Sequence, residues 1–120
     1  MDDNNFELWS RSVGGKPSHF AAGQTIFAET EHGVHAYIVR SGSVEILIDG
    51  RVVETIGPNG IFGEMALIDG GPRSATARAT TACELAPIDQ RMFGLMVDEA
   101  PYFALNVMRL MAARLRRKHD

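Results

Sequence analysis

The strongest indication of the fold is the stretch VEILIDGRVV at residues 44–53. The even-numbered positions from Val44 to Ile48 are all β-branched, which predicts a strand with one buried face. Asp49–Gly50 follows and favours a type I′ turn, because both of its residues tolerate positive φ. Residues 51–53 are again β-rich, so the stretch predicts an antiparallel hairpin.

The glycine distribution extends this interpretation to most of the chain. Eleven of the 12 glycines lie between Gly14 and Gly71, and only Gly94 follows. Glycine supplies the positive-φ turns that join short strands. The predicted strands are Thr25–Ala28, Ala36–Val39, Val44–Ile48, Val52–Ile56, Thr76–Thr81 and Cys83–Ile88. Many short strands at close spacing predict a sandwich, jelly roll or barrel.

The last third of the chain is typical of helices. Asp89 is a suitable cap for a short helix through Val97, and Pro101 suits the first turn of a second helix. Further along, apolar residues at i, i+3, i+4 spacing predict that the second helix is amphipathic. This predicted stripe consists of Leu105, Met108, Met111 (or Ala112) and Leu115.

Length and composition predict one globular domain over residues 1–120, with a barrel at about 17–88 and C-terminal helices at about 89–118. A net charge of −3 gives no overall positive field that would attract nucleic acid. The single cysteine, Cys83, excludes a disulfide framework and is expected to be a buried thiol. No apolar run approaches the ~20 residues of a membrane span, and the acidic start does not suggest a signal peptide. A cytoplasmic protein is therefore expected.

Most of the functional information lies in residues 62–76, FGEMALIDGGPRSAT. Gly63 permits a close approach of the backbone, and the segment that begins at Glu64 favours a short helix, whose N-terminal N–H groups suit an anion. Arg73 adds a permanently charged fork, and Ser74–Ala75 leaves its backbone N–H groups accessible. The Glu64 carboxylate can accept hydrogen bonds from a sugar diol. These residues predict a pocket for a sugar phosphate.

The segment resembles the phosphate-binding cassette of cyclic nucleotide-binding domains, F-G-E-[LM]-A-L followed by P-R-[AST]-A-T. Residues 20–27 look like the first strand of that family, residues 37–44 like its Y-I-[IV]-x-x-G-x-V hairpin, and residues 56–58 like the segment that leads into the cassette. About residues 17–115 can be placed on the family. The resemblance implies a mainly β protein, an eight-stranded jelly-roll barrel with an N-terminal helix before it and two helices after it.

The resemblance also implies which residues bind the ligand. Glu64 is expected to bind the ribose 2′-hydroxyl and Arg73 the exocyclic phosphate oxygens. Backbone amides of the cassette assist Arg73, and apolar residues of the barrel line the base and sugar. The expected ligand-binding set is Ile46, Ile61, Phe62, Gly63, Glu64, Met65, Ala66, Arg73, Ser74, Ala75 and Arg114.

Two further roles follow from the same resemblance. Leu67 is expected to be the hinge contact with the C-terminal helices. In similar bacterial channel domains an arginine of the last helix closes over the base, and Arg114 is the matching position, with Arg117 one turn further on.

These expectations describe a stand-alone sensor without catalysis or cofactor. Its ligand is cAMP or cGMP, and the small side chain of Ser74 favours cAMP, because threonine is common at this position in cGMP-selective relatives. Ligand capture moves the C-terminal helix, and an effector protein is expected to bind that helix. The ligand can drive this movement only through different affinities for the two arrangements. A fragment of a longer protein and a simple nucleotide buffer stay open as alternatives. The oligomeric state stays open.

Two alternatives use the same fold. In a metal-dependent cupin, His32 and His35 could bind a metal, but the chain lacks an H-x-H pair, and this segment is more typical of a solvated loop. In a ligand-free interaction domain the pocket would be vacant, which the intact Glu64–Arg73 pair argues against. The basic cluster Arg109, Arg114, Arg116, Arg117 and Lys118 fits a solvated helix end, a ligand cap or a docking site. DNA contact is not expected, because no helix-turn-helix follows.

Overall fold

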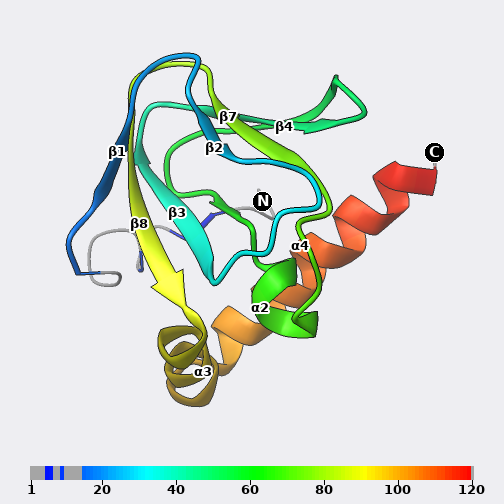
Figure 1. The fold of residues 1–120 in the computed structure, drawn as a ribbon. Coiled ribbons are helices and arrows are strands. Elements are labelled where there is room, and N and C mark those ends of the chain that lie inside the picture. Colours follow the sequence, from blue (N-terminus) through cyan, green and yellow to red (C-terminus); the bar gives the residue numbers. More distant parts are fainter. Residues whose placement is uncertain (1–4, 7–8, 10–14, 120) are drawn as a thin grey trace.

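The computed structural model describes residues 5–6, 9 and 15–119, with side chains described up to Arg116 (Figure 1). Its strands form two antiparallel four-stranded sheets. The first has the order β1 (Ser18–Phe20), β8 (Cys83–Asp89), β3 (His35–Ser41) and β6 (Ile61–Phe62). The second has the order β2 (Thr25–Phe27), β7 (Thr76–Ala79), β4 (Val44–Ile48) and β5 (Arg51–Ile56). The helices are α2 (Met65–Asp69), α3 (Gln90–Glu99) and α4 (Pro101–His119).

This architecture confirms the mainly β fold with C-terminal helices. The N-terminal helix that the family resemblance implies falls largely outside the described residues. Among the described residues, no helix is both long and apolar enough to cross a membrane.

The β4–β5 hairpin forms as the sequence predicts, with one local difference. Asp49 and Gly50 have φ of 52° and 77°, the positive values that a type I′ turn requires. The prediction of a single buried face is wrong, because Val44 and Leu47 are buried whereas Ile46 and Ile48 are only half-buried. The register shifts between Ile46 and Leu47, and such a bulge turns the following side chain out of strict alternation.

The first core cluster lies between the two sheets. It combines residues of β3, β6 and β8 with residues of β4, β5 and β7. Its members are Val39, Val44, Ile56, Phe62, Ala77, Ala79, Cys83 and Leu85, all with relative exposure of 5% or less. The predicted burial of Cys83 is thereby confirmed.

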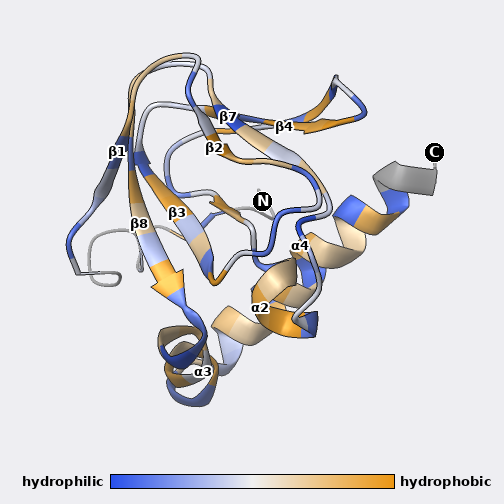
Figure 2. Cartoon of the chain, in the orientation of Figure 1, coloured by the Kyte–Doolittle hydropathy of each residue, from blue (hydrophilic) through white to orange (hydrophobic). Residues whose placement is uncertain are grey.

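A second cluster packs the helices against the strands; in the described part of the chain, the two four-stranded sheets do not close into the predicted barrel. Phe103 of α4 makes edge contacts with Phe6, Trp9 and Phe93. The cluster also contains buried residues of β3, β6, β8, α2 and α3, and hydrophobic residues are visible along β3, β8 and α2 in Figure 2. Leu67 belongs to it, so the cassette helix and α4 share one packed core.

The amphipathic stripe predicted for α4 is only partly correct: Met111 packs against the core and Leu105 is half-buried, but the other predicted members are exposed. Met108 and Leu115 are 58% and 59% exposed, whereas Phe103, Val107 and Leu110 are buried. Continuing the buried stripe by one turn from Leu110 leads to position 114. The observed phase therefore directs Arg114 towards β5 and β6. The first helix was predicted closely, since the Asp89 carboxylate accepts a hydrogen bond from the N–H of Met92 at 2.8 Å and caps α3.

Candidate functional site

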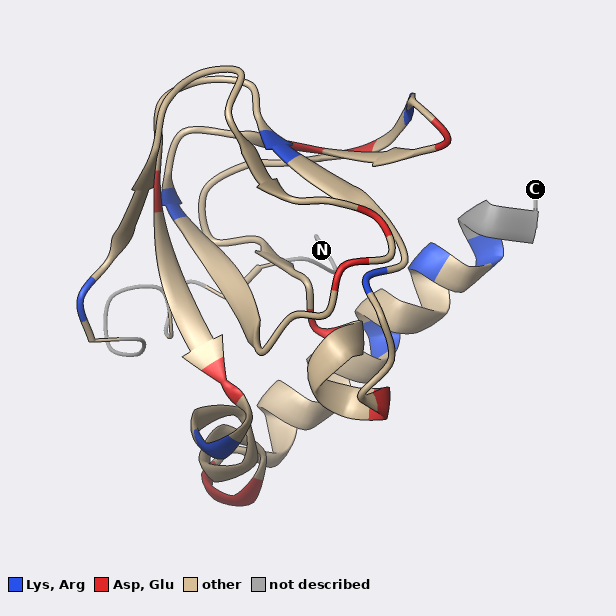
Figure 3. Cartoon of the chain, in the orientation of Figure 1, with Lys and Arg blue, Asp and Glu red and all other residues tan. Residues whose placement is uncertain are grey.

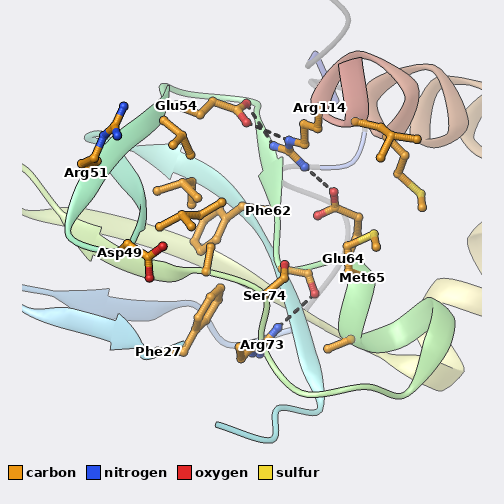
Figure 4. Close-up of a pocket in the computed structure, with 18 of the residues that line it drawn as sticks. Phe27, Asp49, Arg51, Glu54, Phe62, Glu64, Met65, Arg73, Ser74 and Arg114 are labelled. Atoms are coloured by element: carbon orange, nitrogen blue, oxygen red, sulfur yellow. Dashed lines mark hydrogen bonds and ion pairs between the residues drawn. The ribbon is translucent and has the colours of Figure 1, made fainter. Parts of the chain in front are cut away.

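A pocket of about 750 Å³ lies between the β4–β5 hairpin, the segment 62–75 and α4 (Figure 4). Ten of the eleven residues expected to bind the ligand line it, namely Ile46, Phe62, Gly63, Glu64, Met65, Ala66, Arg73, Ser74, Ala75 and Arg114. The structure places the Ile61 side chain elsewhere, fully buried in the core, although its carbonyl accepts a hydrogen bond from Arg114. Arg117 lies beyond the described side chains.

The cassette backbone turns sharply on both sides of α2. Gly63 has φ of +79°, and a Cβ there would lie 2.9 Å from Nη1 of Arg73, so glycine is required for the conformation and for the close approach. At the other end of the helix, Gly70 adopts φ of 69° and donates its N–H to the carbonyl of Ala66 at 3.2 Å. Both turns return the chain so that Arg73 lies beside Gly63.

Arg73 is a buried cation without an anionic partner among the described residues. Its side chain donates to the carbonyls of Gly63 at 3.0 Å and His35 at 2.7 Å. Nε is buried without a hydrogen-bond partner, and the guanidinium carbon lies 3.9 Å from the ring centre of Phe27. Burial lowers the pKa of Arg73, which is the electrostatic cost of holding this charge away from water. An anion in the pocket would relieve that cost.

The β2–β3 loop holds Arg73 in place, which the sequence analysis did not foresee. Thr30 donates its N–H to the carbonyl of Arg73 at 2.9 Å, and Arg73 donates its own N–H to the carbonyl of Glu31 at 2.8 Å. A Cβ on Gly33 would lie closer than 3.0 Å to Nη2, Cζ and Nε of Arg73. The exposed loop expected around His32 is therefore also the wall behind the guanidinium.

Within the described part of the chain, His32 and His35 of this loop belong to no group of metal-binding side chains. Among the residues that the structure describes, no three His, Cys, Asp or Glu side chains lie together in a way that could hold a metal ion. His35 contributes its backbone carbonyl to Arg73.

Arg114 reaches the pocket from α4 and is fully engaged there. It donates from Nε to Oε1 of Glu54 at 2.8 Å and from Nη2 to Oε2 of Glu54 at 3.1 Å. Nη2 also donates to the carbonyl of Ile61 at 2.8 Å, and Nη1 donates to Oε1 of Glu64. Burial alone would lower the pKa of Arg114, but the charge of Glu64 and the bonds to Glu54 outweigh it, and the net shift is upward.

The acidic residue that sequence reasoning missed is Glu54. It lies on β5, 60 positions before Arg114, and no local motif marks it.

Figure 3 shows basic residues of α4 toward its C-terminal end, and Figure 4 shows Arg114 between the two carboxylates. Glu64 is 2% exposed, and its Oε2 accepts no hydrogen bond from the described residues.

Aromatic and aliphatic side chains form the remaining wall. The Phe62 ring stacks on Tyr37 with a centroid distance of 5.5 Å and lies 5.9 Å from Phe27. Ile46 and Val53 add aliphatic surface. Within the described part of the chain, the pocket thus combines a cation that forms no ion pair, a carboxylate oxygen open to a hydroxyl donor, and an apolar wall. It can bind a molecule that has an anionic group, a hydroxyl and an apolar ring.

Comparison with known proteins agrees with this geometry. The chain is 34% identical over 110 residues to the CRP-like cAMP-activated global transcriptional regulator of Mycobacterium tuberculosis, an alignment that covers 88% of this chain and 49% of the relative. It is similar in structure to the Thermus thermophilus catabolite activator protein, with a TM-score of 0.77, 32% identity, and coverage of 87% of this chain and 51% of that one. A cGMP-bound EAL enzyme has a TM-score of 0.68 and 34% identity, over 87% of this chain and 29% of that one.

The likeness to the catabolite activator protein confirms the predicted jelly-roll fold. The chain spans about half the length of the mycobacterial regulator that it matches. The family model of the cyclic nucleotide-binding domain matches residues 17–99, which is well over half of the chain. The chain therefore belongs to the cyclic nucleotide-binding domain family.

Proposed function

We propose that residues 1–120 form one domain that binds a cyclic nucleotide as a sensor, with cAMP favoured over cGMP and no catalysis. The single observation that carries this proposal is the state of Arg73. A buried guanidinium that forms no ion pair with the described carboxylates and leaves Nε without an acceptor is costly, and a phosphate is the anion whose geometry matches its fork.

The other expected residues have complementary roles in the proposal. Glu64 accepts the ribose 2′-hydroxyl through Oε2, and Ile46 and Phe62 pack against the base and sugar. The backbone amides of Gly63, Met65, Ala66, Ser74 and Ala75 assist Arg73 at the phosphate. The Ile61 side chain does not contact the ligand in this proposal. Ile61 supports the site through its packing in the core and through its carbonyl, which accepts a hydrogen bond from Arg114.

The preference for cAMP rests on Ser74. Its side chain is exposed at the pocket. A hydroxyl here can reach either the phosphate or a guanine amino group, so both nucleotides fit. The small serine side chain favours the contact with the phosphate over the contact with the guanine amino group, and it therefore does not select cGMP.

The proposed signal passes from the cassette to α4. Leu67 shares a core cluster with Phe103, Val107 and Leu110 of α4, so a ligand that shifts the cassette also changes the packing of the helix. The ligand biases the arrangement to which it binds more tightly. A partner protein reads α4, on which Tyr102 and Met108 are 80% and 58% exposed.

Isothermal titration of cAMP and cGMP into nucleotide-free protein tests the proposal. Saturable binding is expected, with the higher affinity for cAMP. Arg73→Ala removes a charged contact to the phosphate and should weaken binding by about 30- to 150-fold, equivalent to ~2–3 kcal/mol.

Arg78→Ala is the matched control. Arg78 lies on β7 and pairs with Glu45 at 3.2 Å, and neither residue lines the pocket. This variant should bind as the wild type does. If folded protein gives no binding heat with either nucleotide, the proposal is refuted. If Arg73→Ala and Arg78→Ala lose the same amount of affinity, the role of Arg73 is refuted.

A further inference from the structure

Arg114 joins four parts of the molecule through one side chain. Its donors reach Glu54 on β5, the carbonyl of Ile61 on β6 and Glu64 just before α2, while its own backbone belongs to α4. The side chains of Arg114, Glu54 and Glu64 are 20%, 12% and 3% exposed. Ion pairs that are this sheltered are screened less by solvent than pairs on the surface, and removing one partner leaves a charge uncompensated.

The contribution of Glu54 follows from the geometry of this cluster. Glu54 holds Arg114 with both carboxylate oxygens, at 2.8 and 3.1 Å. A guanidinium bound in this bidentate way has a fixed plane. In that plane only Nη1 of Arg114 points to Glu64, and it donates a hydrogen bond to Oε1 alone. Without Glu54 the guanidinium could turn and bind both oxygens of Glu64, since a bidentate pair is the favoured arrangement.

We propose that Glu54 is a positioning residue for nucleotide binding. By fixing Arg114 it ties α4 to the edge of the pocket and keeps Oε2 of Glu64 open for a ligand hydroxyl. This inference rests on the proposed function, and it assigns to Glu54 an effect that acts through Arg114 rather than through contact with the nucleotide.

The test measures cAMP dissociation by stopped flow with a fluorescent cAMP analogue, together with equilibrium titration. Glu54→Gln keeps the size of the side chain but removes its charge, and it should speed dissociation by about 5- to 30-fold. Arg114→Lys keeps a charge but loses the planar fork, so it should reproduce this change and serves as the second variant if Glu54→Gln does not fold.

Two comparisons separate the proposal from its alternatives. Glu45→Gln is the matched control, because Glu45 forms an ion pair with Arg78 in the same sheet outside the pocket, and it should leave dissociation unchanged. In an Arg114→Ala background, Glu54→Gln should have no further effect on affinity. A full loss of affinity in that background would show that Glu54 acts directly on the ligand, and it would overturn the proposal. The proposal would also be overturned if cAMP dissociated from the Glu54→Gln variant at the wild-type rate.

Hydrogen exchange of the unliganded protein provides a readout that does not depend on nucleotide. Glu54→Gln should speed amide exchange in the last turns of α4, but not in α3. If the wild type binds no cyclic nucleotide and this change is still observed, the proposed function fails while the tie between Glu54 and α4 stands. Unchanged exchange in α4 would refute the tie itself.

Discussion

Replacement of Gly33 by alanine is the most direct test of how the proposed phosphate site is built. A Cβ on Gly33 would lie within 3.0 Å of three atoms of the Arg73 guanidinium, whereas ordinary contact begins at 3.4 Å. The atoms in the way belong to the far end of a flexible side chain, so the side chain can yield while the backbone stays. The guanidinium must then move by about 1 Å.

A shift of this size separates the donors of Arg73 from their acceptors. The bonds to the carbonyls of His35 and Gly63 are 2.7 and 3.0 Å long, and hydrogen bonds weaken steeply beyond normal lengths. Loss of one such bond should lower the unfolding free energy by about 1–2 kcal/mol. Because the cation also leaves the phosphate position, affinity for cAMP should fall by about 10- to 150-fold.

Titration calorimetry and urea denaturation measure the two effects separately. Gly57→Ala is the matched control, since a Cβ on Gly57 would meet no described residue within 4 Å, and it should leave affinity unchanged. In an Arg73→Ala background, Gly33→Ala should cause no further loss of affinity. If Gly33→Ala binds cAMP with wild-type affinity, Gly33 does not position Arg73 for binding. If Gly33→Ala causes the same loss of affinity in the Arg73→Ala background, its effect does not pass through Arg73. Either result would refute the prediction.

Three further predictions concern the scaffold. Gly94 lies inside α3 with open space around a Cβ, so Gly94→Ala should raise the unfolding free energy in urea by up to about 1 kcal/mol, and a decrease would contradict the open space. Asp89→Ala removes the acceptor for the N–H of Met92 and should lower the unfolding free energy by about 1 kcal/mol, whereas an unchanged midpoint would show that the cap contributes nothing. Burial raises the pKa of Cys83 and favours its neutral thiol, so at pH 8 it should react with Ellman's reagent far more slowly in the folded protein than in urea; equal rates would refute its burial.

The features that were predicted correctly from the sequence are local ones. The turn at Asp49–Gly50 is dictated by two residues that tolerate positive φ, and the cap at Asp89 by one side chain and the next turn. The cassette is also local, because Gly63 and Arg73 are 10 positions apart and the chain between them only needs to turn back. Short segments of this kind contain their own determinants.

The features that were missed depend on contacts between distant segments. Two faces of α4 are apolar, and periodicity alone cannot decide which of them packs inward. Phe103 decides it, because it meets Phe6, Trp9 and Phe93, which come from other parts of the chain. The need for glycine at position 33 likewise appears only once Arg73, 40 positions later, is packed against it.

The two arginines of the pocket show why an anion is drawn to one side of it. Arg114 already has two carboxylates and a carbonyl, so an added phosphate would meet a local charge that is negative overall. Among the described residues, Arg73 has only carbonyl acceptors and its Nε has no acceptor, so the same phosphate would meet a positive charge that no described carboxylate pairs with. Under the proposed function, the electrostatic energy would orient a ligand with its phosphate at Arg73 and its neutral part toward α4. In the proposed function, a nucleotide in this orientation would contact the cassette through its phosphate and α4 through its base, and it would couple the two only while Arg114 keeps α4 at the pocket.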